Sequence, residues 1–212
     1  MASDRASVAG HIVDADGAAI AGATVVVRAT GEHTSADSNG AFVIDVPANT
    51  TLTLATTAPG MATTLLPQLM VSPGGTAAFT IPMVTTARLK SLAMMGPNPA
   101  GGVVMVEVKS VSGDAASSGA TTIDLTPSNL GRVLYAPESP GIADPDPSLT
   151  SMGSGSDCLA WALGVQPHVS IMEFALRGAV QLDPPYSIDD VIWPGTFTVD
   201  AGALTLLTLF TP

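Results

Sequence analysis

The sequence is poor in charged side chains. Only 12% of its 212 residues are Asp, Glu, Lys or Arg, and only two are lysines, whereas about a quarter is usual. Thr, Ser, Gly, Pro and Asn must therefore cover the surface, which is more typical of extracellular β-proteins than of cytosolic helical ones. The formal net charge of −11 excludes a large basic patch, so we expect neither nucleic acid nor an anionic membrane as a partner.

Cysteine is nearly absent as well. The one cysteine, Cys158, cannot form an internal disulfide. A catalytic cysteine needs a nearby histidine and a polar setting, but Cys158 lies in the apolar run DCLAWAL. We therefore expect it to be a small buried residue.

Long apolar runs are also missing. No stretch of about 18 apolar residues occurs, so no membrane span is expected. The N-terminal residues MASDRAS lack the apolar core of a signal peptide. Together with the composition, this favours the mature form, with a new start Met, of a secreted, periplasmic or cell-surface protein.

What the first part of the chain does contain is a series of short β-type runs separated by turn signals. Residues 7–13, 23–30 and 41–47 read as strands, and the last of these alternates clearly between apolar and exposed positions. DADG at 14–17 and Asn39-Gly40 are good turn sequences. Seven short strands within residues 7–84 predict an antiparallel β-sandwich.

These residues also carry a resemblance to a known family. The matching positions are Gly10, Asp16-Gly17, Ile20, Gly22-Ala23-Thr24-Val25, Asp37, Gly40, Phe42, Val46-Pro47, Leu52-Thr53-Leu54 and Ala58-Pro59-Gly60. With them, residues 7–84 resemble the carboxypeptidase regulatory-like domain. The resemblance implies a transthyretin-like Greek-key sandwich. Because that family is appended to many proteins and is rarely catalytic, it also implies a binding, spacing or folding module.

The rest of the chain reads as a linker and a second domain. Residues 85–102 end in a Pro/Gly/Asn cluster typical of a linker, with at most a short helical turn. Residues 103–211 contain faint echoes of the first domain, such as GATTID for GATVVV, and predict a divergent repeat. The alternative is that any two small β-sandwiches look alike at this level. The predicted fold class is all-β, with two tandem antiparallel Greek-key β-sandwiches of the transthyretin or immunoglobulin-like type.

Acidic pairs are the candidate metal ligands. Asp144 and Asp146 lie in the proline-stiffened segment ADPDPS and form a weak calcium candidate, below the alternative of an exposed extended loop. Asp14 and Asp16 lack the further ligands of a calcium loop and fit a plain hairpin turn. A third acidic pair, at 189–190, fits protection of an edge strand. Otherwise no cofactor is expected.

Aromatic residues suggest a weak ligand surface. Trp161 lies in the apolar run and is expected in the core. Trp193 comes just before a turn and is the more exposed candidate. With Tyr186 it could form a sugar-stacking platform.

No catalytic constellation is recognisable. The histidines His11, His33 and His168 lack metal-ligand spacing. The intradiol dioxygenases, which share a related sandwich, bind iron with two Tyr and two His, but their local motif is absent here. The sequence GSGSD (153–157) does not have the spacing of GxSxG. We therefore do not expect an enzyme.

Two functional hypotheses remain. The first is a non-enzymatic extracellular or cell-surface protein for adhesion, scaffolding or self-assembly, which meets a protein or glycan surface through strand edges or the loop 128–157. The second is a pair of accessory domains from a larger secreted hydrolase or receptor, where they would aid folding or bind substrate or glycan.

Overall fold

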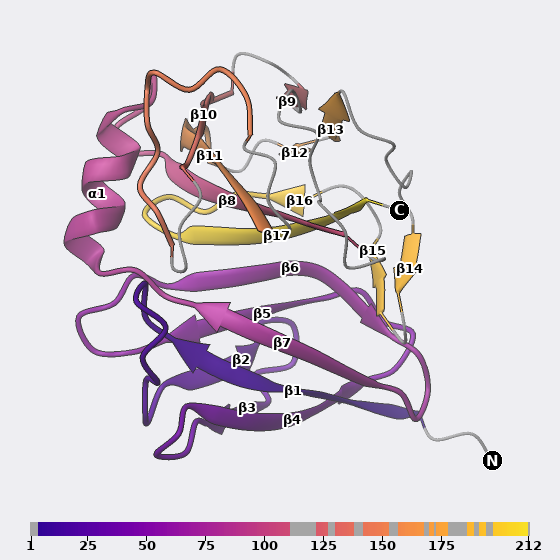
Figure 1. The fold of residues 1–212 in the computed structure, drawn as a ribbon. Coiled ribbons are helices and arrows are strands. Elements are labelled where there is room, and N and C mark those ends of the chain that lie inside the picture. The colour runs from indigo at the N-terminus through magenta and orange to yellow at the C-terminus, as the bar shows by residue number, and fades with distance from the viewer. Residues whose placement is uncertain are drawn as a thin grey trace. The chain divides into compact units, whose positions relative to one another are not determined.

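The protein is described by a computed structural model, in which almost every element is a β-strand (Figure 1). The structure describes residues 4–110, 122–126, 130–137, 142–152, 157–167, 170–171, 173–177, 186–188, 191–193 and 197–211. Within these residues, none of the helices has the length and apolar character needed to cross a membrane. The all-β prediction is confirmed.

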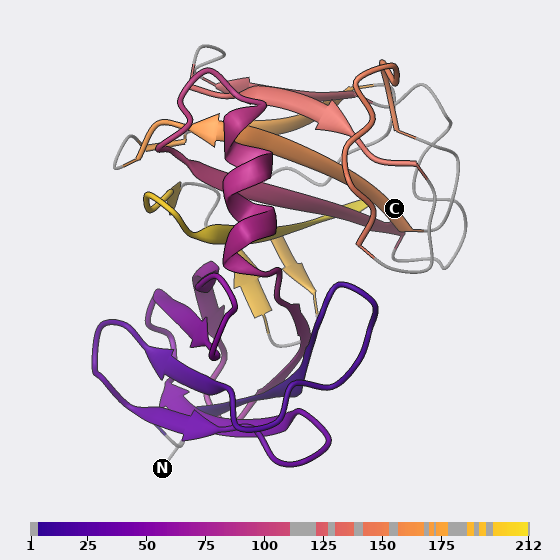
Figure 2. The same cartoon turned by 90° about the vertical axis from the view of Figure 1, so that its left-hand side faces the viewer.

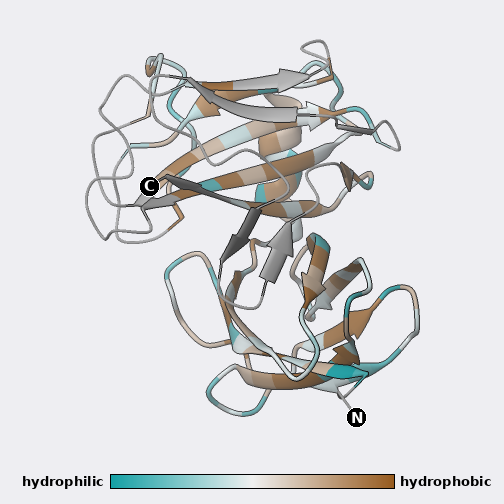
Figure 3. Ribbon diagram, turned by 90° about the vertical axis from the view of Figure 1, so that its right-hand side faces the viewer, coloured by the Kyte–Doolittle hydropathy of each residue, from teal (hydrophilic) through white to brown (hydrophobic). Residues whose placement is uncertain are grey.

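The chain divides into two compact units. The first comprises Met1–Thr86 together with Pro184–Gly195, and the second comprises Ala87–Asp183 together with Thr196–Pro212. The sequence placed all of 103–211 in one domain, so the assignment of 184–195 to the first unit was not foreseen. In both units the apolar residues lie mainly along the strands (Figure 3).

The first unit contains a three-stranded sheet in the order β4-β1-β7. Its strands are β1 (Arg5–Val13), β4 (Ala41–Pro47) and β7 (Thr76–Pro82). β1 runs antiparallel to β4 and parallel to β7. The alternation read from the sequence is confirmed, because Phe42, Ile44 and Val46 are buried while Val43 and Asp45 are exposed.

A second layer of this unit has the order β3-β2-β5-β6. Its strands are β2 (Thr24–Val27), β3 (His33–Ser35), β5 (Leu52–Thr57) and β6 (Thr64–Val71). The short hairpin of β14 (Tyr186–Ile188) and β15 (Val191–Trp193) adds to β6. Val25, Val27 and Leu54 are fully buried and supply part of the core.

Two turns of the first unit share one hydrogen-bonding pattern. The Asp14 carboxylate accepts hydrogen bonds from the backbone N–H groups of Asp16 (2.9 Å) and Ala18 (2.8 Å). The Asp37 carboxylate does the same for Asn39 (2.8 Å) and Ala41 (2.9 Å). Each Asp is followed three residues later by a glycine at positive φ, 85° in the first turn and 73° in the second. Asp14 therefore caps a hairpin turn, as the sequence indicated.

We predict that Asp14→Ala lowers the free energy of unfolding of the first unit by about 1 kcal/mol, because two backbone N–H groups lose a charged acceptor. Urea unfolding followed by hydrogen exchange in each unit measures the change. The matched control is Asp16→Ala in the same turn, where we expect almost no change because its side chain makes no described hydrogen bond. Equal losses in the two variants would contradict this role for Asp14.

The predicted linker contains a helix. α1 (Thr86–Met94) is nine residues long and buries Leu89, Leu92 and Ala93. The sequence predicted one short helical turn here, whereas the structure has a helix of nine residues (Figure 2). Burial of one apolar face stabilises such a short helix where propensity alone would not.

The second unit contains a four-stranded sheet in the order β10-β11-β8-β17. Its strands are β8 (Gly102–Ser110), β10 (Arg132–Tyr135), β11 (Asp157–Val165) and β17 (Leu204–Thr211). A bulge interrupts the pairing of β11 with β8 between Ala162 and Val165. There the chain of Gly164 passes so close to the Asn98 backbone that it leaves no room for a Cβ atom.

Short strand pairs form the other layer of the second unit. They are β9 (Thr122–Thr126) with β13 (Glu173–Arg177), and β12 (Ser170–Ile171) with β16 (Phe197–Thr198). Ile123 and Phe197 pack into one cluster with Val104, Val106 and Cys158. The predicted burial of Cys158 is thus confirmed.

The two units repeat one strand arrangement. In the first, β1 has β4 as its antiparallel neighbour and β7 as its parallel neighbour. In the second, β8 has β11 as its antiparallel neighbour and β17 as its parallel neighbour. Each unit therefore contains a parallel pair that the antiparallel prediction did not include. A parallel pair needs a crossover, which β5 and β6 provide in the first unit.

Candidate functional site

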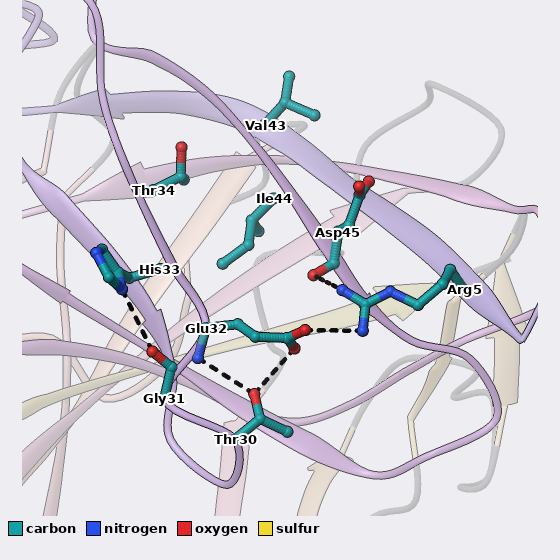
Figure 4. A pocket seen from close by; sticks show the side chains of 9 residues that line it. All are labelled: Arg5, Thr30, Gly31, Glu32, His33, Thr34, Val43, Ile44 and Asp45. Atoms are coloured by element: carbon teal, nitrogen blue, oxygen red, sulfur yellow. Dashed lines mark hydrogen bonds and ion pairs between the residues drawn. The ribbon is translucent and has the colours of Figure 1, made fainter.

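A shallow groove of about 570 Å³ lies where β3 and β4 come close together (Figure 4). Its lining comes from β1, from the turn before β3, from β3 itself and from β4. The lining residues are Arg5, Thr30, Gly31, Glu32, His33, Thr34, Val43, Ile44 and Asp45. Apart from the exposed Val43 and the buried Ile44, the groove is polar.

Two charged groups of the groove, Arg5 and Glu32, bind each other. Arg5 forms an ion pair with Glu32 at 2.8 Å and donates a hydrogen bond to the backbone carbonyl of Asp45, also at 2.8 Å. The Thr30 hydroxyl donates to the second carboxylate oxygen of Glu32 at 2.9 Å. Figure 4 shows Arg5 and Glu32 pointing toward each other across the groove. These contacts join β1 to the turn before β3 and to β4 at the edge of the sandwich.

The same contacts lower the pKa of Glu32 below its ordinary 4.5, first through the hydrogen bond from Arg5 and then through that from Thr30. The carboxylate therefore favours folding above its ordinary pKa, and this contribution is lost as the pH falls through the lowered value. We predict that Arg5→Ala raises the pKa of Glu32 toward its ordinary value. An NMR titration of the Glu32 carboxyl carbon measures it.

The control for this titration is Arg28→Ala. Arg28 is not among the groups that lower the pKa of Glu32, so this variant is expected to leave it unchanged. A Glu32 pKa that is the same in Arg5→Ala as in the native chain would show that the ion pair does not form in solution.

The outer edge of β4 is largely occupied. The backbone N–H and C=O of Ala41 point away from β1, because both bond to Asp37. The direction of the backbone N–H and C=O groups alternates along a strand, so the backbone groups of Val43 and Asp45 point outward as well. Arg5 occupies the Asp45 carbonyl, and Pro47 has no N–H to offer. Little of this edge is left for another strand.

The opposite edge of the sheet, on β7, is open. The Ser7 N–H bonds to Gly75 and the Met83 N–H bonds to Val13, which fixes the direction of the ladder between β1 and β7. By alternation, the backbone groups of Ala78 and Thr80 point outward. No hydrogen bond to either is found among the described residues. Both side chains are exposed, and β7 carries no charge.

The acidic candidates Asp144 and Asp146 have partners within the second unit. Arg88 of α1 forms an ion pair with Asp144 at 2.7 Å and also donates to the Ile142 carbonyl at 2.6 Å. The Asp146 carboxylate accepts from the backbone N–H of Ser148 at 2.8 Å and from its hydroxyl at 2.7 Å, and these bonds lower the pKa of Asp146. A cation here would compete with Arg88 and Ser148. Calcium binding stays a prediction.

The same loop is fixed to the core of the second unit. Trp161 is fully buried, as the sequence predicted. Its indole N–H donates to the Ala143 carbonyl at 3.1 Å, and the Asp146 N–H donates to the Tyr135 carbonyl at 2.8 Å. Residues 142–149 are therefore held by three contacts, from Arg88, from the Trp161 indole and from the Tyr135 carbonyl.

The aromatic candidates Tyr186 and Trp193 are register partners in the hairpin of β14 and β15. The structure thus brings their backbones together on a segment of the first unit. Their side chains lie outside the described part, so the predicted ligand surface stays a prediction. The pair at 189–190 and His168 also lie outside the described residues.

The other candidate ligands do not form a cluster. Tyr135 belongs to the second unit, where its hydroxyl accepts a hydrogen bond from the Ile123 N–H at 3.1 Å. His11 and His33 belong to the first unit. Among the described residues, no three side chains of His, Cys, Asp or Glu lie together as metal ligands would.

Comparison with known families gives a match for the first part of the chain. Residues 7–84 match the carboxypeptidase regulatory-like domain. The matched segment spans the strands from β1 to β7, and the resemblance found in the sequence is confirmed for these residues. No curated protein matches the chain.

Solved structures give partial or remote likenesses. A type II cohesin-X-dockerin complex from Acetivibrio cellulolyticus is 26% identical, with 37% of this chain and 57% of that chain covered and a TM-score of 0.33. Hydroxyquinol 1,2-dioxygenase from Pseudomonas putida is 14% identical, with 40% and 58% covered and a TM-score of 0.32. The shaft pilin SpaA from Lactobacillus rhamnosus GG is 8% identical, with 97% and 98% covered and a TM-score of 0.28. The chain thus spans less than two thirds of the first matched structures, and these low scores carry no functional inference.

Proposed function

We propose that the chain is a non-enzymatic β-sandwich protein of the cell surface or the extracellular space, which serves scaffolding, adhesion or self-assembly by binding other protein chains. The open edge of β7 carries this proposal. At Ala78 and Thr80 it presents outward backbone groups beside exposed, uncharged side chains. A strand edge of this kind binds an extended segment through main-chain hydrogen bonds.

Two further observations support the proposal. Two pairs of charged groups are held in ion pairs, Arg5 with Glu32 in the groove and Arg88 with Asp144 in the second unit, which suits a structural role better than proton transfer. The low content of charged residues suits a protein outside the cytoplasm.

A peptide titration tests whether the β7 edge binds a strand. The probe is a capped synthetic peptide that copies residues 75–82, added to isotope-labelled protein. We expect the NMR signals of the Ala78 and Thr80 amides to shift and their hydrogen exchange to slow. Absence of both effects at millimolar peptide would contradict the proposal.

Two proline variants form a matched pair for this titration. Ala78→Pro removes an outward N–H from β7, and Val43→Pro removes an outward N–H from β4. Neither N–H belongs to the ladder with β1, so both variants should fold. We expect Ala78→Pro to abolish the effect of the peptide and Val43→Pro to keep it.

A further inference from the structure

The exposed edge of β7 is self-complementary. Its outward residues are Thr76, Ala78 and Thr80, which read the same in both directions about Ala78. If a second β7 lies antiparallel with Ala78 opposite its own copy, the two Ala78 residues exchange both of their backbone hydrogen bonds. Thr76 and Thr80 then face each other across the strands, a favourable cross-strand pair.

The charge distribution permits this pairing. The chain carries a net charge of −11, and two copies would repel each other if acidic groups met at the contact. Strand β7 has no charged residue, and its neighbours across the ladder with β1 are Ser7, Ala9 and His11. No acidic side chain therefore lies on β7 or opposite its outward residues on β1, and the contact is free of repulsion between acidic groups.

Pairing of two β7 strands would also bury apolar surface on the inner face of β7. Phe79 is only partly buried, whereas its neighbours Ala77 and Ile81 on the same face are buried. In the register centred on Ala78, Phe79 of one copy lies opposite Ala77 of the other. Additional burial of a partly exposed aromatic ring is a favourable hydrophobic contribution.

The opposite edge of the sheet limits the assembly. On β4, Asp37 occupies both backbone groups of Ala41, Arg5 occupies the Asp45 carbonyl, and the strand ends in a proline. A sheet with one open edge and one blocked edge forms a closed pair, whereas two open edges would give a filament.

We propose that the β7 edge binds a second copy of this chain, forming a two-fold dimer in which the three-stranded sheets join as β4-β1-β7-β7-β1-β4. This inference rests on the proposed function, since it names the partner of the same edge. Under this inference, self-assembly through this sheet stops at a dimer and does not continue to a filament.

Charge reversal at the two-fold axis tests the dimer. In sedimentation equilibrium, the native chain is expected to dimerise reversibly. Ala78→Lys and Ala78→Glu each place like charges opposite one another and should weaken dimerisation at least about tenfold. An equimolar mixture of the two variants should recover it, because opposite charges then meet. Val43→Lys puts the same charge at the equivalent place on β4 and should leave dimerisation unchanged.

Each outcome decides the inference. Loss of dimer in both single variants with recovery in the mixture supports it. A native chain that stays monomeric at millimolar concentration overturns it, and so does a dimer that Ala78→Lys leaves intact or that Val43→Lys disrupts. The proposed function is judged separately: if the peptide copy of residues 75–82 still binds a strictly monomeric chain, the edge serves a different protein partner, and if it does not, both fail.

Discussion

Gly10→Ala is expected to lower the free energy of unfolding of the first unit by about 3 kcal/mol, the upper range for overpacking a core. Gly10 lies in the middle of β1, opposite Phe42 on one side and Phe79 on the other. A Cβ atom at this position would collide with the Phe79 carbonyl and lie 3.1 Å from Cε1 of Phe42. Because the first obstacle is backbone, the clash is relieved only by moving β7 away from β1.

Hydrogen exchange resolved by unit measures this loss, since the two units need not unfold together. The control is Gly17→Ala, where a Cβ atom meets nothing within 4 Å and only the positive φ is unfavourable, at about 1 to 2 kcal/mol. A Gly10→Ala chain as stable as the native one would mean that β1 and β7 do not approach as closely as described. The description of β7 as the edge strand beside β1 would then be wrong.

Trp161→Ala is expected to destabilise the second unit by about 3 to 5 kcal/mol, the usual range for removing a large aromatic side chain from a core. Trp161 is fully buried on β11, between Leu134 and Met105 in the ladder. Its loss leaves a cavity and also removes the hydrogen bond to the Ala143 carbonyl. Residues 142–149 should then become accessible to proteases.

Trp161→Phe separates the two effects. It keeps most of the apolar volume but has no N–H, so we expect a loss of about 1 to 2 kcal/mol together with cleavage of the loop. Lys90→Ala, an exposed change on α1, should alter neither stability nor cleavage. If Trp161→Phe leaves the loop as resistant as in the native chain, the indole hydrogen bond does not hold it.

Local patterns in the sequence were enough to predict the β-sandwich of residues 7–84, but two strands were not identified. The polar segment 31–40 was read as a loop, yet His33–Ser35 forms β3 because β2 offers it a partner. LLPQLMV was ambiguous because Pro67 interrupts it. In the structure the register between β5 and β6 shifts between Leu52 and Leu54, next to Pro67, which has no N–H to pair. Gln68 there takes a positive φ of 55°.

The sequence predicted the type of binding surface but not its position. A strand edge was expected as the binding surface, and the absence of charge in TAAFT is visible in the sequence. Which edges stay open, however, depends on pairings between residues far apart, such as Ser7 with Thr76. The ion pair of Arg5 with Glu32 and that of Arg88 with Asp144 likewise join distant positions, and no local pattern indicates them.

The central claim is that the β7 edge is where this chain meets another strand. Amide hydrogen exchange at Ala78 and Thr80, compared with Val43 on β4 and followed over protein concentration, tests it most directly. We predict fast exchange at all three positions in dilute protein. As the concentration rises, protection should appear at Ala78 and Thr80 only. If Ala78 and Thr80 exchange as fast in concentrated as in dilute protein, and also with the peptide copy of residues 75–82 present, the claim is wrong.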